Sequence, residues 1–182
     1  MHTSFEIQTT YTQDAIRAMT RMAYDLFQPQ LSGRIYLVAF ILLIIGGLGY
    51  SSDNPGFIAM LAVGCFSLTS AEYAPKAAAK RMISFFNGNY PVLKFDFRPD
   101  NIFVVTPQDS GSVRYDILVR LAESKDYLFL FNSQESAYIL DKNGFTRGTN
   151  DEFKTFIQSK TGLTFERGAT LKQKLIAAIR KK

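Results

Sequence analysis

The side chains that most often carry out catalysis or bind metal ions are scarce in this chain. It contains one histidine, His2, near its start, and one cysteine, Cys65, inside a long apolar run. Ser-His-Asp and Cys-His catalysis need a histidine beside a nucleophile, and zinc sites need several such ligands. One cysteine also excludes an internal disulfide. The sequence therefore predicts neither histidine-dependent nucleophilic catalysis nor a His/Cys metal site.

Carboxylates are numerous, but their spacing indicates no reactive pair. Most of them fall in turns or at a helix start, where polar turn residues and helix capping account for them. Nothing in the spacing brings two together for acid/base work or Mg²⁺ binding. The sequence also contains no glycine-rich phosphate-binding loop. Gly144 and Gly148 have the spacing of turn glycines and do not form such a loop. We therefore predict that the chain is not an enzyme and binds no cofactor. The carboxylates considered are Asp96, Asp100, Asp109, Asp116, Glu123, Asp126, Asp141, Asp151 and Glu152.

Glu72 is the acidic residue with the most unusual position, at the end of an apolar run. An acid near a membrane could serve an ion pathway or a proton relay. The interpretation that we favour is an interfacial carboxylate paired with Lys76, one helical turn later. One hairpin per chain also cannot line a conduit without oligomerisation.

The stretch from Ile35 to Ser70 contains no Lys, Arg, Glu or His, and its one formal charge is Asp53. A membrane helix needs about 20 mostly apolar residues. We therefore expect two spans, at about 31–50 and 56–74, joined by the turn SSDNPG. A buried helical hairpin in a soluble protein is the alternative, but 182 residues are too few to enclose two helices that are apolar all round.

Basic residues flank this hairpin and are absent from its central turn. Arg17, Arg21 and Arg34 precede the first run, and three more follow the second. This pattern predicts a membrane hairpin with both termini in the cytoplasm. Small residues, namely Gly46, Gly47 and Gly49 in one helix and Ala59, Ala62 and Gly64 in the other, would permit close helix contact. The candidate membrane-interface residues are Arg34, Glu72, Lys76, Lys80, Arg81, Lys172, Lys174, Arg180, Lys181 and Lys182.

The predicted elements, with the hairpin included, divide the chain into four segments. Residues 1–30 hold a short strand and an amphipathic helix that Thr12 caps and that Pro29 and Gly33 break. Residues 31–90 hold the hairpin and a membrane-proximal helix. Residues 91–166 form a β-rich domain with a closing helix, which Asn150 or Thr149 caps and Gly162 ends. Its expected strands are 92–97, 102–106, 112–121, 127–132 and 136–141.

The residue pattern of 167–182 predicts a basic amphipathic helix. Leu171, Leu175 and Ile179 line one side, and the other side is strongly basic. Two placements stay open, on the anionic inner leaflet or as a solvated helix against the sheet. The net charge of +5 suits anionic lipids. The strand aromatics have few Lys or Arg among them, so we expect core packing and no nucleic-acid binding.

The order of these elements resembles a known family. The segments FDFRPDNIFV, YDILVRLAESKDYLFLF, AYILDKNGF and the helix starting near NDEF are similar to the YcxB-like bacterial membrane proteins. Polar marks of the resemblance are Glu123, before the YLFLF strand, and Lys142, before Phe145. The family implies a cytoplasmic domain of pleckstrin-homology-like type and supplies no catalytic residues. This chain has Asp141-Lys142 where the family pattern leads us to expect a Pro-Lys pair.

Together with this resemblance, the sequence predicts an α+β protein of the bacterial inner membrane. It would have a two-helix transmembrane hairpin and a small antiparallel β-rich cytoplasmic domain closed by a helix. The expected role is binding or regulation at the membrane surface. Its partners would be the lipid bilayer, anionic lipids, and a protein partner or a second copy. Two alternatives remain, an immunity or resistance protein against a membrane-acting toxin and an oligomeric transport component.

Overall fold

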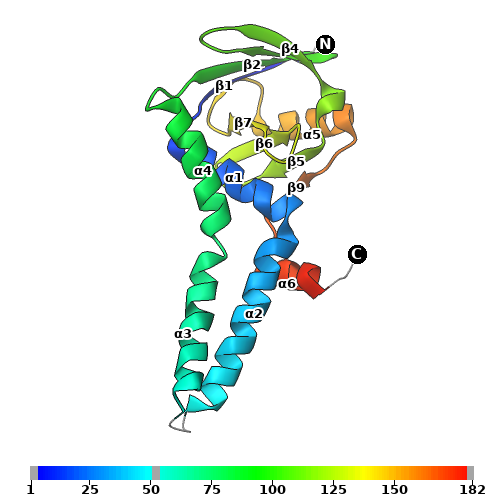
Figure 1. Ribbon diagram of the computed structural model, residues 1–182. Coiled ribbons are helices and arrows are strands. Elements are labelled where there is room, and N and C mark those ends of the chain that lie inside the picture. Colours follow the sequence, from blue (N-terminus) through cyan, green and yellow to red (C-terminus); the bar gives the residue numbers. More distant parts are fainter. Residues whose placement is uncertain (1–3, 51–53, 180–182) are drawn as a thin grey trace. The chain divides into compact units, whose positions relative to one another are not determined.

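The computed structural model describes residues 4–50 and 54–179 (Figure 1). The chain divides into two compact units. We call Met1–Ala23 with Ala79–Gly168 the sheet unit, and Tyr24–Ala78 with Ala169–Lys182 the hairpin unit. The boundaries between them fall inside two helices, α1 (Gln13–Phe27) and α4 (Tyr73–Phe86).

The sheet unit contains two sheets and one helix, α5. The five-stranded sheet is antiparallel and has the order β4-β3-β2-β1-β8. The four-stranded sheet has the order β7-β6-β5-β9, in which only the β5–β9 pair is parallel. The first sheet contains β1 (Phe5–Thr10), β2 (Val92–Phe97), β3 (Asn101–Val105), β4 (Ser110–Arg114) and β8 (Phe145–Arg147). The second contains β5 (Arg120–Glu123), β6 (Tyr127–Phe131), β7 (Ala137–Asp141) and β9 (Phe165–Glu166).

Strand β1 links the two sheets, although the sequence places it far from its neighbours. It lies between β2 and β8, and its side chains alternate strictly between buried and exposed. Two side chains also connect this segment to β7. Thr9 Oγ1, on β1, accepts a hydrogen bond from the Asp141 N–H at 2.9 Å. The hydroxyl of Tyr11, the residue directly after β1, accepts one from the Ile139 N–H at 3.0 Å. Burial raises the pKa of Tyr11 well above its usual value, so this hydroxyl stays neutral.

Helix α5 (Asn150–Thr161) closes the core as the sequence predicts. Thr149 caps it in a reciprocal capping box with Glu152, and Gly162 ends it at φ 69°. The buried Phe153 ring packs edge-on against Phe97, with ring centroids 4.6 Å apart. The strand aromatics Phe95, Phe97, Phe129 and Phe131 are buried, as the sequence predicts, whereas Phe103 and Tyr127 are only half-buried.

The prediction of one strand over residues 112–121 is wrong. The chain leaves the first sheet after β4, makes a 3₁₀ turn, η2 (Tyr115–Ile117), and enters the second sheet as β5. Tyr115 is buried, and its hydroxyl donates a 2.6 Å hydrogen bond to the carbonyl oxygen of Arg98. This long-range bond holds the corner. Alternating apolar residues look the same whether a strand continues or changes sheets.

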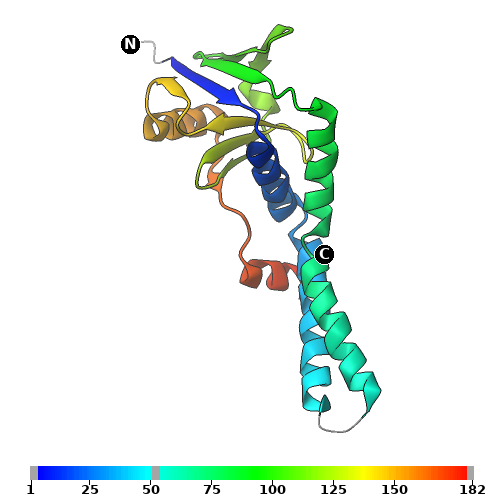
Figure 2. The ribbon, with the colours of Figure 1, turned by 90° about the vertical axis from the view of Figure 1, so that its left-hand side faces the viewer.

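The hairpin unit contains α2 (Pro29–Leu48) and α3 (Pro55–Ser70), which lie side by side in both views (Figures 1 and 2). The expected break at Gly33 is wrong. Helix α1 ends at Phe27 and α2 begins at Pro29, where proline suits the first turn, and Gly33 lies inside α2. Helix α3 is followed almost at once by α4, so that Pro55–Phe86 forms a 32-residue apolar helical stretch.

Glycines allow α2 and α3 to approach closely, which confirms the prediction for some of the small residues named from the sequence. A Cβ at Gly46 would lie 2.9 Å from the Phe57 carbonyl oxygen, and one at Gly64 would lie 3.2 Å from that of Ala39. Gly49 is covered by the Phe57 ring. The expectation fails for Gly47, where such a Cβ would meet nothing within 4 Å, and for the exposed residues Ala59 and Ala62.

Both long helices could cross a membrane by length and composition, and neither forms a protein core. Only 17% of the most apolar stretch of α2 is buried, and only 11% of that of Pro55–Phe86. The core helix of a soluble protein would be mostly covered. Their large apolar side chains point outward instead. The exposed ones include Val38, Phe40, Ile41, Ile44, Ile45, Leu48, Ile58, Met60, Val63 and Phe66.

Candidate functional site: a charged collar on the hairpin unit

Charged side chains gather at one end of the helical hairpin. We call Asp25, Arg34, Glu72, Lys76, Lys172 and Lys174 the charged collar; all belong to the hairpin unit. Helices α2 and α3 are antiparallel, and Ala39 meets Gly64 while Gly46 meets Leu61. This register brings Arg34 level with the end of α3, where Glu72 follows. The sequence between Ile35 and Ser70 carries a single formal charge, at Asp53.

The predicted pairing of Glu72 with Lys76 is confirmed. The Lys76 Nζ and a Glu72 carboxylate oxygen are 3.2 Å apart, and both side chains are more than one-third exposed. Such a pair stabilises a helix by a few tenths of a kcal/mol. Glu72 therefore stands at the end of the apolar stretch and does not face the middle of the hairpin.

The C-terminal helix α6 (Leu171–Ile179) brings a second ion pair to the collar. Lys174 Nζ lies 2.6 Å from an Asp25 carboxylate oxygen, and the two side chains are only 13% and 14% exposed. Sequence reasoning missed Asp25, because the partners of a tertiary ion pair share no local spacing. Lys174 is thus held by protein, whereas Lys172 on the same helix is exposed.

Among the described residues, Arg34, Lys80 and Arg81 take part in neither of these two ion pairs. Arg34 is exposed on α2. Lys80 and Arg81 are exposed on the part of α4 that belongs to the sheet unit. Arg180, Lys181 and Lys182 lie outside the described residues, as do His2 and Asp53.

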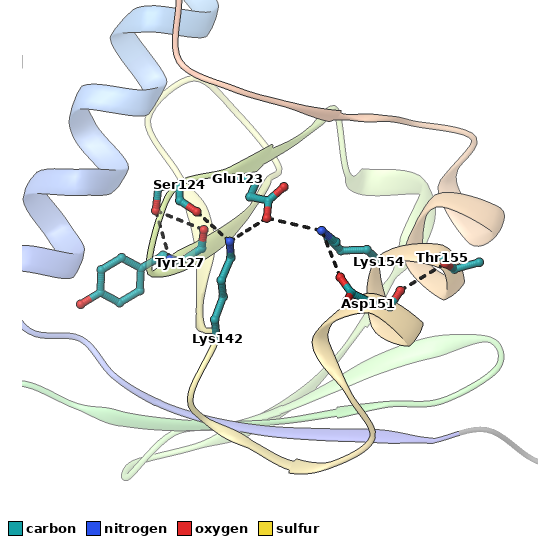
Figure 3. A network of polar contacts seen from close by, with 7 residues as sticks. All are labelled: Glu123, Ser124, Tyr127, Lys142, Asp151, Lys154 and Thr155. Atoms are coloured by element: carbon teal, nitrogen blue, oxygen red, sulfur yellow. Dashed lines mark hydrogen bonds and ion pairs between the residues drawn. The ribbon is translucent and has the colours of Figure 1, made fainter.

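The sheet unit holds a polar network of its own (Figure 3). The Lys142 ammonium donates to a Glu123 oxygen at 2.6 Å and to the Ser124 carbonyl at 2.8 Å. Lys154, on α5, reaches the same Glu123 oxygen at 3.4 Å and Asp151 at 3.4 Å. The side chain of Glu123 is 16% exposed. The network therefore cross-links β5, the turn after β7, and α5.

The chemistry of this network is that of a structural cross-link. The hydrogen bond from Lys142 is the main reason that the pKa of Glu123 lies below its usual 4.5, and the charges of Lys142 and Lys154 act in the same direction against desolvation. A carboxylate so held is ionised at neutral pH and makes a poor proton donor. Within the described ranges, no three His, Cys, Asp or Glu side chains are placed to hold a metal ion.

Two shallow grooves adjoin on the sheet unit and share Gln8 and Thr146. One, of about 390 Å³, runs along β1 and the turn between β7 and β8. The other, of about 420 Å³, crosses β1, β2 and β3. Amide, hydroxyl and charged groups of both signs line them, which suits a polar ligand better than an apolar one. Their polar lining includes Glu6, Gln8, Thr10, Lys94, Asp96, Asp141, Asn143 and Thr146.

These observations define an α+β protein with two helices that could cross a membrane. Residues 97–157 match the family model described as YcxB-like protein, so the chain contains a YcxB-like domain over that stretch. The match runs from the last residue of β2 into α5 and includes Glu123, Lys142 and Lys154. No curated protein and no solved structure matches the chain.

Replacement of Glu123 by glutamine should destabilise the sheet unit in a pH-dependent way. A carboxyl whose folded pKa is lowered adds stability above its unfolded pKa, and this contribution is lost as the pH falls through the folded pKa. We expect Glu123→Gln to lower the free energy of unfolding by about 1–3 kcal/mol at pH 7. The difference from the parent should shrink as the pH falls below 4.5.

The measurement is chemical unfolding of the full chain in detergent micelles, followed by near-UV circular dichroism across this pH range. Glu135→Gln is the matched control, because Glu135 is an exposed residue between β6 and β7. Equal effects of the two substitutions, or a Glu123→Gln effect that does not vary with pH, would show that the network does not stabilise the fold.

Proposed function

We propose that this chain is an integral protein of the bacterial inner membrane, with α2 and α3 crossing the bilayer and both termini in the cytoplasm. The observation that carries the proposal is the uncovered apolar surface of the hairpin, bounded by the charged collar at one end. Exposure of this surface to water would cost roughly 25 cal/mol of free energy for each Å² of apolar area. A bilayer supplies the apolar contact that the protein lacks.

The dimensions agree with this placement. Helix α2 has 20 residues and is therefore about 30 Å long, which equals the thickness of a bilayer's hydrocarbon core. The second helical stretch, Pro55–Phe86, is longer than a membrane requires. Its α4 end, which carries Lys76, Lys80 and Arg81, would extend past the hydrocarbon into the headgroups and the cytoplasm.

The pairing of β1 with β2 supports an even number of crossings. These strands flank the hairpin in sequence, and they form neighbouring strands of one sheet, with Phe5 opposite Phe97 and Thr9 opposite Leu93. Two strands that share hydrogen bonds must lie in the same compartment. The chain before α2 and the chain after α4 are therefore on the same side of any membrane that the hairpin enters, and basic flanks favour the cytoplasmic side.

We further propose that the sheet unit is a non-catalytic binding or regulatory module of pleckstrin-homology-like type. Support comes from its two sheets closed by α5, from the carboxylate chemistry of the Glu123 network, and from the polar grooves along β1. The groove lining offers donors and acceptors on a rigid sheet, which suits a polar segment of a protein partner. The alternative of transport through Glu72 gains no support, because that carboxylate pairs with Lys76 at the end of the hairpin.

Cysteine labelling tests the membrane placement, and the native Cys65 is one of the probes. Cys65 is exposed on α3, so in a water-soluble protein it would react readily. In cells we expect a membrane-impermeant maleimide to leave Cys65 unlabelled until the membrane is dissolved by denaturing detergent. In a Cys65→Ser background, Asn54→Cys should react in spheroplasts, and Glu135→Cys only after the membrane is permeabilised.

Two results would contradict the placement. Labelling of Cys65 as fast as Glu135→Cys in permeabilised cells would mean that α3 is in water. Labelling of Glu135→Cys in intact spheroplasts would mean that the sheet unit lies outside the cytoplasm.

Site-specific photocrosslinking tests the binding role. A photoreactive amino acid at Asn143, an exposed groove residue, should give a discrete protein adduct in cells. The same amino acid at Glu135, which is exposed but does not line a groove, should give none. Adducts of equal yield at both positions, or none at either, would argue against a protein ligand in the groove.

A further inference from the structure

Helix α6 is built to lie across α2 at one defined point. A Cβ at Gly33 would collide with the carbonyl oxygen of Lys174 and would lie 3.1 Å from the Cβ of Ala178. The two backbones therefore touch, and only glycine allows this approach. Gly47, on the same helix, has open space where its Cβ would be. The requirement for glycine is thus specific to the crossing.

Two polar arrangements fix α6 in addition to this contact. The poorly exposed Asp25–Lys174 ion pair ties the middle of α6 to the hairpin unit. The helix begins with its own capping box, in which the Thr170 N–H donates to Gln173 at 2.8 Å and the Gln173 N–H donates to Thr170 at 3.3 Å. Helix α6 is therefore a defined element with a defined position on α2.

The surface that α6 leaves open is apolar and basic. Leu171, Ile176 and Ile179 are 46%, 43% and 67% exposed, and Lys172 is exposed beside them. By sequence, residues 167–182 contain no acidic residue. Apolar side chains together with an excess of basic over acidic residues are typical of helices at an anionic membrane surface. The basic residues of this segment are Arg167, Lys172, Lys174, Arg180, Lys181 and Lys182.

The position of the crossing gives the depth of α6 along the hairpin. Gly33 directly precedes Arg34, the last charged residue before the apolar run that begins at Ile35. Helix α6 also lies across α2 and does not run along it (Figures 1 and 2). If α2 spans a membrane, the start of its apolar run lies at the boundary between hydrocarbon and headgroups. Helix α6 crosses α2 at that point and would therefore lie at the same boundary.

We propose that α6 is an in-plane interfacial helix of the cytoplasmic leaflet that recognises anionic phospholipids. Ile176 and Ile179 contact acyl chains, and Lys172 contacts lipid phosphates. The apolar surface of α6 then continues that of α2, and one bilayer covers both. This inference rests on the proposed function, since it requires α2 and α3 to span the membrane.

The test measures the depth of single fluorophores in the full chain. In a Cys65→Ser background, an environment-sensitive probe is attached to cysteine at Ile176 or Ile179, and at two reference sites, Val63 and Glu135. The protein is placed in vesicles of phosphatidylcholine and phosphatidylglycerol whose lipids carry bromine near the headgroup or deep in the chain. We expect headgroup-level bromine to quench both α6 probes, deep bromine to quench Val63, and aqueous iodide to quench Glu135.

The reference sites separate the two proposals. If deep bromine quenches Val63 while iodide alone quenches the α6 probes, α6 is in water and this inference fails, although the hairpin still spans. If the α6 probes are shielded from both bromine and iodide, protein covers them, either a second copy or a partner, and the inference fails again. If no lipid bromine quenches Val63, the proposed function fails, and the placement of α6 fails with it.

A second arm tests the preference for anionic lipid. Quenching of the Ile179 probe by brominated phosphatidylglycerol should exceed that by brominated phosphatidylcholine. Lys172→Gln should reduce this preference by about five-fold, which is the expected effect of one lysine near an anionic surface. Lys125→Gln, which removes an exposed lysine from the sheet unit, should leave it unchanged. Equal quenching by the two lipids in the parent protein would exclude anionic recognition by α6.

Discussion

The outward apolar surface of α2 and α3 is the constraint on which the other features of this protein depend. Within residues 4–50 and 54–179, little protein covers these helices, and most of their apolar stretches are exposed. Their mutual contact uses Gly46 and Gly64, so the large side chains are free to point outward. The charged collar stands at one end of the apolar stretch, and α6 crosses α2 at the same end. Each of these features follows if a bilayer is the missing layer.

The sheet unit meets a different constraint, because the hairpin interrupts it in sequence. Strand β1 precedes the hairpin and β2 follows it, yet the two pair along six residues of each. The side chains of Thr9 and Tyr11 then extend this connection to β7 in the second sheet. A fold of this kind forms only after the chain on both sides of the hairpin reaches the same compartment. Folding of the sheet unit and topology of the hairpin are therefore linked.

Local patterns in the sequence predicted the elements whose causes are local. The near-absence of charge over Ile35–Ser70 predicted the hairpin, and Asn150 or Thr149 with Gly162 predicted both ends of α5. Features that depend on distant partners escaped prediction. The turn at Tyr115 depends on the Arg98 carbonyl, and Lys174 depends on Asp25. Gly33 was interpreted as a helix breaker. Its actual role is to allow close contact with the backbone of α6, which is remote in sequence and leaves no local signal. Strands β8 and β9 were too short to leave a pattern.

The central claim is that the hairpin is embedded in lipid, and alkaline carbonate extraction tests it most directly. Membranes from cells that express the full chain are washed at high pH, which releases proteins held at the surface by charge, and are then floated on a density gradient. Because the uncovered side chains of α2 and α3 would lie among acyl chains, the account predicts that the protein stays with the floated lipid. Recovery of folded protein in the aqueous supernatant would contradict it.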